Sequence, residues 1–570
     1  MKFKKIRIYL IFILAVLLVV GFIPGFSKQT KADNIETSVT VGNDPPDFDT
    51  DAVCGNYPCE SPARYTASPV NVGSSTTFRA TADEPNGEQY YLIVCKTNVF
   101  NENNSGAPTC DTGQTICVSS ATNDGEVASC NYQAQQGDNE NQVWYAKVCD
   151  ANTTDQTCSA TSQGNTGQNE ASPLVVNHAP NVTSVQNDAG ESSPNDPGDY
   201  VTWTTVASDP DTDSGDTISL YVCSTNSFNG SCAATTLCYD IGKSSNPTCS
   251  YQIPAGTDDD SSPYSAYAFI VDEHGFDPSV STSSGYYVAN VAPTILSIST
   301  NGGSAIVLTG GEYPSTTNIS FVVSIQDNNG CNDLDDPSSY VMYRSSVSGG
   351  SSCSGNVNNC YTGDSGDYKV VCNSNSTCTG GSDVDVTYTC TAAMQYHTDP
   401  TVENTPWSDD TWLSYFEIAD DDLEEVDDTA TGVELNMLQA LDSGNLSYGS
   451  MSAGMHDDYL VDSNEVTNTG NTGLNTQVSS SAPMSDGQGH TIAVNNQRAD
   501  ETYNTEWDSA SIVLSGTGQT VEIRTPKTTI SSSPEVDYVY WGINIPDDQF
   551  PATYTGTTTL AAIYSGPSYW

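Results

Sequence analysis

The sequence predicts an all-β protein: a tandem array of about four β-sandwich domains, three of them braced by disulfides, preceded by an N-terminal signal helix. A cysteine-containing strand occurs twice, as YLIVCKTNVF at residues 91–100 and as SLYVCSTNSF at residues 219–228. Two Asn-x-Ala-Pro tetrapeptides each precede an alternating apolar stretch that is typical of a strand. Outside the first 32 residues, no long stretch shows helical periodicity.

The first 32 residues have the order of a secretory signal. Four basic residues precede an apolar run from Ile8 to Val20, and Pro24 then leads to a polar stretch that ends at Ala32. We expect cleavage after Ala32 and an extracellular mature chain, either secreted or associated with the cell surface. The alternative is an uncleaved anchor, because the apolar run extended through Phe26 approaches the length that spans a bilayer. No second run of that length occurs, so cleavage would leave no membrane span.

The cysteines predict disulfides. All 18 lie beyond the leader, in groups of two, six, four and six along the chain. Even groups indicate intramolecular bonds formed in an oxidising compartment, and the paired spacing of a zinc site is missing. Cys54 and Cys59 would close a small loop. Cys149 and Cys158 of the first copy are both absent from the second copy, so we infer that they are bonded to each other.

The other four cysteines of each copy allow three pairings. We favour the pairing in which every bond closes a short loop. The favoured pairs are Cys95 with Cys110, Cys117 with Cys130, Cys223 with Cys232, and Cys238 with Cys249. The pairing of the six cysteines from Cys331 to Cys390 stays open.

The two tetrapeptides begin at Asn177 and Asn290 and mark domain junctions. They bracket 113 residues, a usual size for one β-sandwich. The predicted divisions are a signal peptide at 1–32, an acidic leader segment at 33–61, and sandwiches at 62–177, 178–291, 292–430 and 431–570. The third sandwich is divergent, and the fourth contains no cysteine.

Three motifs characterise these domains: the Asn-x-Ala-Pro junctions, the segment ASDPDTDSGDTISLYVC at 207–223, and the aromatic strand SAYAFIVDEHG at 265–275. The first copy matches the aromatic strand with QVWYAKVCDAN at 142–152. Together they resemble the immunoglobulin-like and fibronectin-type-III-like β-sandwich repeats of secreted bacterial surface proteins, over roughly residues 62–430. The resemblance implies an architecture of stalks and adhesive arrays and names no ligand.

The charge of the chain limits its partners. The sequence has 16 Lys and Arg against 71 Asp and Glu, a net charge of −55. Six of the basic residues lie in the first 32, so the mature chain carries 10 minus 71, or −61. We expect this charge to repel nucleic acid and anionic membranes and to leave a divalent cation or a basic partner as a favoured contact. The alternative is that acidity only keeps an extracellular protein soluble.

No catalytic motif stands out. The sequence has no His-Glu-x-x-His, glycine-rich phosphate loop or nucleophile elbow. We therefore predict an exported cell-surface structural or adhesive protein that is not an enzyme and whose partner is a cell-surface protein or a glycan. One alternative is a secreted carbohydrate-active enzyme with a carboxylate pair that the fold brings together. Another is a calcium-dependent module that binds carbohydrate or protein.

Calcium is the one cofactor that the sequence suggests. Acids alternate through SDPDTDSGD, at Asp209, Asp211 and Asp213, and Asp216 follows. Oxygen ligands from a tight loop suit calcium, although this loop lacks the sharp-turn glycine and the closing glutamate of an EF-hand. We favour a solvated acidic turn over a calcium site, because nearly every turn of the chain is acidic.

Tryptophans could also stack on sugars. Most of the seven lie in alternating strands, where a buried Trp belongs to the core of a sandwich. Trp570 is the one that we expect to be exposed.

Overall fold

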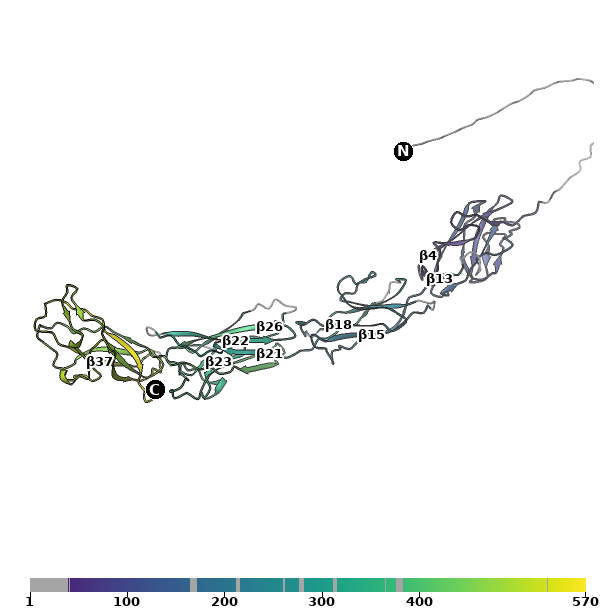
Figure 1. Cartoon of the computed structure of the whole chain (residues 1–570). Helices are drawn as coiled ribbons and strands as arrows, with labels where there is room; N and C mark the ends of the chain where they lie inside the picture. Colours follow the sequence, from purple (N-terminus) through teal and green to yellow (C-terminus); the bar gives the residue numbers. More distant parts are fainter. Residues whose placement is uncertain are drawn as a thin grey trace, which may run out of the picture. The chain divides into compact units, whose positions relative to one another are not determined.

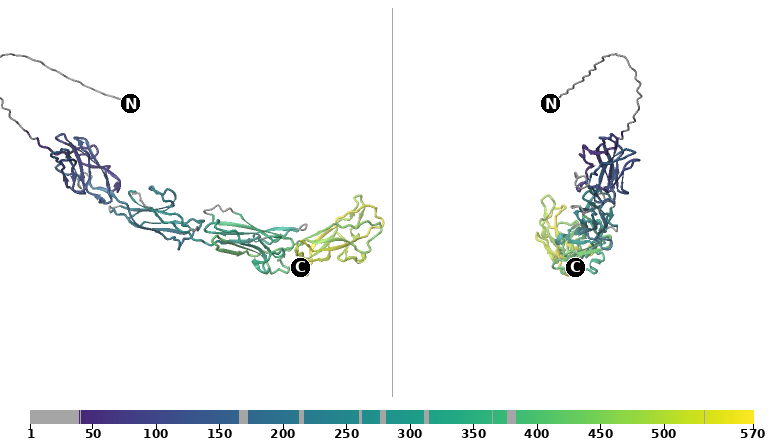
Figure 2. Two further views of the ribbon diagram at one scale, coloured as in Figure 1. Left: turned by 180° about the vertical axis from the view of Figure 1, so that it is seen from behind. Right: turned by 90° about the vertical axis from the view of Figure 1, so that its right-hand side faces the viewer.

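The computed structural model describes residues 39, 41–164, 172–211, 216–259, 262–275, 281–310, 315–363, 365–375, 383–530 and 532–570. The predicted signal peptide at 1–32 lies outside these residues. The described part of the chain contains strands β1–β38 and four three-residue 3-10 helices, at Asn301–Gly303, Gly350–Ser352, Val494–Asn496 and Trp507–Ser509. Figures 1 and 2 show strands and loops throughout their coloured parts. The all-β prediction is confirmed, and no described helix has the length and apolar character needed to cross a bilayer.

The chain forms two compact units. One contains the segment up to Tyr65 together with Ser75–Gln133 and Asn141–Leu174. The other contains Thr66–Ser74, Ala134–Glu140 and Val175–Trp570. The first unit holds most of sandwich 1, and the second holds sandwiches 2, 3 and 4, defined below by their strands.

Sandwich 1 has two antiparallel sheets. The first has the strand order β1-β4-β10, and β2 also pairs with β4. The second has the strand order β12-β5-β8, and β9 also pairs with β5. Their bounds are β1 Asp47–Asp49, β2 Cys59–Ser61, β4 Ser75–Asp83, β5 Gln89–Cys95, β8 Thr115–Val118, β9 Thr122–Asn123, β10 Val127–Gln133 and β12 Tyr145–Asp150. Shorter strands are β3 Val70–Asn71, β6 Phe100–Asn101, β7 Thr109–Cys110, β11 Asn141–Gln142 and β13 Leu174–Asn177. Strands β1 and β2 pair with β4 although they lie within 33–61, where we expected an acidic leader.

Burial alternates along the strands of sandwich 1, as the period of two requires. Phe78 and Trp144 are fully buried, and their rings meet edge to face with centroids 5.1 Å apart. The Trp144 indole N–H donates a hydrogen bond to Oε1 of the buried Glu60 carboxyl group at 2.5 Å. Burial raises the pKa of Glu60 to about 8, so this group carries a proton at neutral pH.

Sandwich 2 pairs a three-stranded sheet, β14-β15-β18, with a four-stranded sheet, β17-β16-β19-β20. The bounds are β14 Asn181–Asn187, β15 Tyr200–Ser208, β16 Ile218–Cys223, β17 Thr236–Lys243, β18 Thr248–Gln252, β19 Tyr267–Asp272 and β20 Thr282–Ser283. Trp203, Leu220 and Ile270 lie in its core.

Sandwich 3 pairs the sheet β21-β22-β26-β25 with the sheet β24-β23-β27-β28. The bounds are β21 Thr294–Thr300, β22 Thr316–Gln326, β23 Ser339–Arg344, β24 Cys360–Thr362, β25 Val370–Ser374, β26 Asp385–Gln395, β27 Trp412–Ala419 and β28 Glu425–Thr429. The first, second, sixth and fifth strands thus form one sheet, and the fourth, third, seventh and eighth form the other. This Greek-key order is that of immunoglobulin-like sandwiches.

Sandwich 4 has a different order, β29-β30-β37-β34-β35 in one sheet and β36-β31-β38 in the other, with β32 and β33 paired separately. The bounds are β29 Leu441–Ser443, β30 Asp462–Asn468, β31 Leu474–Ser479, β32 Met484–Ser485, β33 Thr491–Ile492, β34 Gln497–Asp500, β35 Ile512–Val513, β36 Gln519–Thr525, β37 Val536–Ile543 and β38 Thr559–Tyr564. Its core contains Trp541, Val478 and Val521 and no disulfide.

The disulfides of sandwiches 1 and 2 join the cysteines that we paired from the sequence. They are Cys54–Cys59, Cys95–Cys110, Cys117–Cys130, Cys149–Cys158, Cys223–Cys232 and Cys238–Cys249. In sandwich 3 the bonds Cys353–Cys360 and Cys372–Cys390 are present, and Cys331 is also disulfide-bonded. No described cysteine is free.

Candidate functional site at the domain junctions

The same pair of side chains ties the start of each of the first three sandwiches to the end of its long aromatic strand. An asparagine Nδ2 donates a hydrogen bond to an aspartate carboxylate, which can only accept. We call these the junction pairs: Asn43 to Asp150 at 2.9 Å, Asn177 to Asp272 at 2.9 Å, and Asn290 to Asp420 at 3.1 Å. Asp150 and Asp272 end β12 and β19, and Asp420 follows β27 directly.

The second and third junction pairs use the Asn-x-Ala-Pro tetrapeptides that the sequence identified. The first pair was missed. Asn43 begins Asn-Asp-Pro-Pro, which differs from the other tetrapeptides only at the x position and by Pro45 in place of alanine. A search that tolerated this change, followed by strand β1 at Asp47, would have found it.

A loop completes each junction, and it follows β4 in sandwich 1, β15 in sandwich 2 and β22 in sandwich 3. The backbone N–H that follows the junction asparagine donates to a loop side chain: Asp44 to Asn86 at 2.9 Å, His178 to Asp211 at 2.6 Å, and Val291 to Asn329 at 2.8 Å. The loop residue in turn donates its own N–H to an acid two positions earlier: Asn86 to Glu84 at 3.1 Å, Asp211 to Asp209 at 3.0 Å, and Asn329 to Asp327 at 2.8 Å. Glu84, Asp209 and Asp327 are therefore equivalent. Burial raises the pKa of all three, to about 6 for Asp209 and Asp327.

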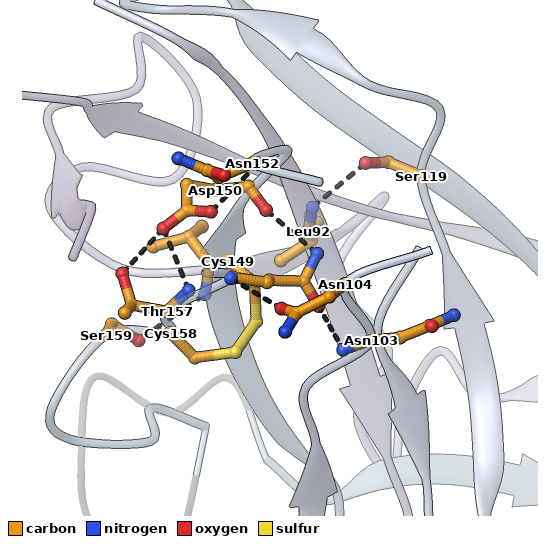
Figure 3. The surroundings of a disulfide bond; sticks show 12 residues. Leu92, Asn103, Asn104, Ser119, Cys149, Asp150, Asn152, Thr157, Cys158 and Ser159 are labelled. Atoms are coloured by element: carbon orange, nitrogen blue, oxygen red, sulfur yellow. Dashed lines mark hydrogen bonds between the residues drawn. A yellow bond between two sulfur atoms is a disulfide. The ribbon is translucent and has the colours of Figure 1, made fainter. Parts of the chain in front are cut away.

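In sandwich 1, hydrogen-bond donors surround the junction aspartate (Figure 3). Asp150 accepts from the Thr157 N–H at 2.9 Å, from the Thr157 hydroxyl at 2.5 Å and from the Asn152 N–H at 3.0 Å. The Cys149–Cys158 disulfide holds together the hairpin that supplies these donors. The carboxylate charge is thus compensated without a cation.

In sandwich 2, histidines contact the acids. The His178 Nδ1 lies 2.7 Å from the Asp211 carboxylate. The His274 Nε2 lies 3.6 Å from a carboxylate oxygen of Asp216 and 3.5 Å from one of Glu273. A cavity of about 10 Å³, the size of one water, lies beside Asp211, Asp216 and His274.

These contacts bear on the calcium loop that the sequence suggested. Asp211 is engaged by His178, and Asp209 accepts the Asp211 N–H. Asp216 lies with Glu273 and His274, whose ligand atoms all fall within 4.8 Å of one another, and Asp213 lies outside the described residues. Calcium at Asp209, Asp211, Asp213 and Asp216 stays a prediction.

In sandwich 3, three carboxylates meet without a basic residue. Asp327 follows β22, Asp333 lies in the β22–β23 loop, and Asp420 follows β27. They offer one oxygen each within 4.8 Å of the others, and their exposed fractions are 0%, 5% and 0%. We call them the buried acid cluster. Among the described residues, no Lys, Arg or His forms an ion pair with any of the three.

The hydrogen-bond needs of the buried acid cluster are only partly met. Asp420 accepts from Asn290 and from the Glu424 N–H at 2.8 Å. Oδ2 of Asp327 and both carboxylate oxygens of Asp333 are buried and have no hydrogen-bond partner. Burial raises the pKa of Asp333, and the neighbouring carboxyl of Asp421 raises it further.

A loop of sandwich 2 brings two more acids to this place. Ligand oxygens of Asp258, Asp259 and Asp333 lie within 4.8 Å of one another. Burial raises the pKa of Asp259 to about 6, and the charges of Asp422 and Asp421 contribute. Nearby, the Asn329 Nδ2 donates to the backbone oxygens of Ala289 at 2.9 Å and Thr257 at 3.3 Å, so polar contacts accompany the acids between the two sandwiches.

A second group of charges is compensated internally. The buried Lys527 lies 3.0 Å from a carboxylate oxygen of Asp399, and the Arg344 Nε lies 3.4 Å from the other oxygen. Both cations face the ring of Trp407, whose centroid is 5.6 Å and 5.2 Å away. Trp570, which we expected to be exposed, is half-buried with its ring 5.6 Å from that of Trp407.

Another cavity, in the part of the chain from Asn404 to Pro567, has a volume of about 650 Å³. Its described lining residues are Asn404, Thr405, Pro406, Met437, Tyr564 and Pro567. None is an acid, whereas a glycosidase of the usual kind needs two carboxylates on either side of the sugar.

No family model and no curated protein matches the chain. Similar solved structures include a marsupial T cell receptor, with 8% identity, 64% of this chain and 98% of that chain covered, and a TM-score of 0.25. The D1–D4 ectodomain fragment of ICAM-5 has 9% identity, 89% and 99% coverage, and a TM-score of 0.20. Dimeric latent PorU from Porphyromonas gingivalis has 9% identity, 64% and 32% coverage, and a TM-score of 0.13. With all three scores below 0.5, the fold assignment rests on the strand order and packing of the chain itself.

Proposed function

We propose that the chain is an exported structural or adhesive protein of the cell surface, a stalk of β-sandwiches without catalytic activity. The observation that supports this best is the repeated junction. What recurs in sandwiches 1, 2 and 3 is a hydrogen-bonded device that fixes where one domain begins, together with disulfides that brace its sheets. A repeated scaffold feature of this kind, in place of a repeated set of reactive groups, supports a structural role.

The disulfides support an extracellular location, because such bonds persist in oxidising compartments. The charge of −55 supports a soluble surface that avoids anionic membranes and nucleic acid. We propose a cell-surface protein or a glycan as the partner.

Protease digestion of intact cells that produce the chain tests the location. We expect protease added to intact cells to release the disulfide-braced domains from the outside of the cell. We also expect N-terminal sequencing of the exported chain to place its first residue near Asp33. A chain that is protected in intact cells and carries free thiols would refute export. A glycan array and a screen of purified surface proteins then test adhesion.

A carbohydrate-active enzyme is the second candidate, because a cavity of about 650 Å³ can accept a sugar, although the carboxylate pair would have to come from residues other than its described lining. Incubation with a panel of polysaccharides, followed by measurement of new reducing ends, decides between the two. Release of reducing ends that disappears when acids are replaced by amides would favour the enzyme.

A further inference from the structure

The buried acid cluster presents an electrostatic problem that the described residues do not solve. A carboxylate that is moved out of water loses its hydration, and in native proteins a partner or a bound proton normally replaces the lost water. Asp327, Asp333 and Asp420 are at most 5% exposed and lie within 4.8 Å of one another. Each one therefore raises the cost of ionising the other two.

The oxygens without partners show where compensation is missing. Both carboxylate oxygens of Asp333 and one of Asp327 accept no hydrogen bond, although they are inaccessible to water. Buried polar atoms in native proteins are nearly always satisfied, so such atoms point to an absent ligand or proton.

At the equivalent junction of sandwich 2, basic side chains lie beside the acids. There His178 and His274 contact the acids. The matching junctions align His178 with Val291 and the triplet Asp272-Glu273-His274 with Asp420-Asp421-Asp422, so Asp422 replaces His274. Sandwich 3 keeps acids at the positions of Asp209 and Asp272, namely Asp327 and Asp420. It has Asn329 where sandwich 2 has Asp211, and it lacks both histidines.

We propose that Asp327, Asp333 and Asp420 bind one calcium ion, and that Asp259 from the loop of sandwich 2 contacts the same ion. All the ligand atoms are carboxylate oxygens, which suit calcium, and four carboxylates can supply the six to eight oxygens that it takes. Magnesium requires stricter octahedral geometry and keeps more water, and zinc prefers nitrogen and sulfur. The ion would bridge Asp333 of sandwich 3 and Asp259 of sandwich 2 and so restrain the junction between them.

The binding test uses the full chain, treated with EDTA and dialysed into metal-free buffer with about 0.15 M NaCl to screen exposed charges. Calorimetric titration with CaCl2 is compared for the unmodified chain, for Asp333→Asn and for Asp336→Asn. Asp336 is exposed and only three residues from Asp333, so this control makes the same change of charge at a position outside the cluster. We expect Asp333→Asn to weaken one calcium equivalent at least tenfold and Asp336→Asn to leave it unchanged. Equal binding by all three chains would overturn the proposal.

Hydrogen exchange separates calcium from a bound proton as the compensating species. With calcium, the amides near the ends of β22 and β27 should exchange more slowly in the unmodified chain, and not in Asp333→Asn. In EDTA, Asp333→Asn should be at least as protected as the unmodified chain, because the amide removes a buried charge. This result also shows that the variant folds. If calcium slows exchange in neither chain, a proton satisfies the cluster and the proposal fails.

The contribution of sandwich 2 is tested with Asp259→Asn. We expect a calcium affinity between those of the unmodified chain and Asp333→Asn, because Asp259 is one ligand among four and is more accessible. Magnesium at the same concentration should protect β22 and β27 less. An affinity of Asp259→Asn equal to that of the unmodified chain would limit the site to sandwich 3 and refute the bridge.

Discussion

Sandwiches 2 and 3 share one junction framework and differ in how its acids are compensated. Both tie an asparagine to an aspartate at the end of the aromatic strand, and both hold the next backbone N–H with a loop side chain. Sandwich 2 adds two histidines, whereas the cluster of sandwich 3 has no described cation beside it. Sandwich 1 uses a third solution, the N–H and hydroxyl donors around Asp150. The same arrangement of hydrogen bonds at the junction thus occurs with three different electrostatic environments, and among the described residues the cluster of sandwich 3 is the one without a basic partner.

We expect the largest effect on stability from removing the disulfide that holds the hydrogen-bond donors of Asp150 in sandwich 1. Replacing Cys149 and Cys158 with serine releases the hairpin that carries Thr157, and for a loop of about ten residues the loss of stability is on the order of 2 to 3 kcal/mol. Hydrogen exchange of β12 in the full chain measures it. Removal of Cys54 and Cys59, which are five positions apart, serves as the control and should cost less. Unchanged protection of β12 would show that Asp150 does not depend on the disulfide.

We expect the next largest effect from removing the contact between His178 and Asp211 in sandwich 2. His178→Leu leaves the buried Asp211 carboxylate without its side-chain donor and should destabilise sandwich 2 by about 2 kcal/mol. The double variant with Asp211→Asn should recover part of the loss, because the charge is removed as well. His456→Leu is the matched control, since His456 is exposed and faces the exposed Asp458. The exchange rates of β14 and β15 amides report the change, and equal rates in all variants would contradict it.

A third experiment moves the histidines of sandwich 2 into sandwich 3. Val291→His together with Asp422→His should weaken calcium binding by about tenfold, or about 1.4 kcal/mol, because internal donors and positive charge then compete with the ion. Calorimetric titration of the full chain measures the affinity. Calcium binding as tight as in the unmodified chain would show that the histidines do not distinguish the two junctions.

The smallest effect is a dependence on pH. The pKa of Asp327 is raised from 3.8 to about 6, so without calcium the folded chain holds a proton that the unfolded chain has released. This contribution is complete below pH 3.8 and is lost as the pH rises through about 6, so sandwich 3 should melt a few degrees lower at pH 7 than at pH 5. Calcium should reverse the sign, because it binds the ionised carboxylates. Melting curves with EDTA and with calcium at both values check this, and a cluster that is more stable at pH 7 in EDTA would contradict it.

The sequence predicted the local features of this protein well. Alternating burial in β15 and β27 follows from the period of two in their residues. The joint absence of two cysteines from the second copy pointed to the Cys149–Cys158 bond that the structure contains. The tetrapeptides at Asn177 and Asn290 directly precede the first strands of sandwiches 2 and 3. They could be recognised because the proline and the alternating apolar residues lie next to each other in the sequence.

The candidate site depended on contacts between distant residues. Asp209, Asp211 and Asp216 drew attention because they are close in sequence, but the structure engages Asp211 with His178, which lies 33 residues earlier. Asp327 and Asp420 meet only when β22 and β27, which belong to different sheets, end at the same edge of the sandwich. In a chain with 71 acids, composition and spacing do not show which carboxylates lose their water.

By itself, the sequence determined an all-β chain of repeated, disulfide-braced sandwiches, because strand periodicity, turn residues and cysteine spacing act over short distances along the chain. Only the tertiary structure decided which acids are buried together and which of them lack a partner. The energy of a carboxylate depends on water exclusion and on charges within a few ångströms, and the packing of strands and loops from separate parts of the chain sets both.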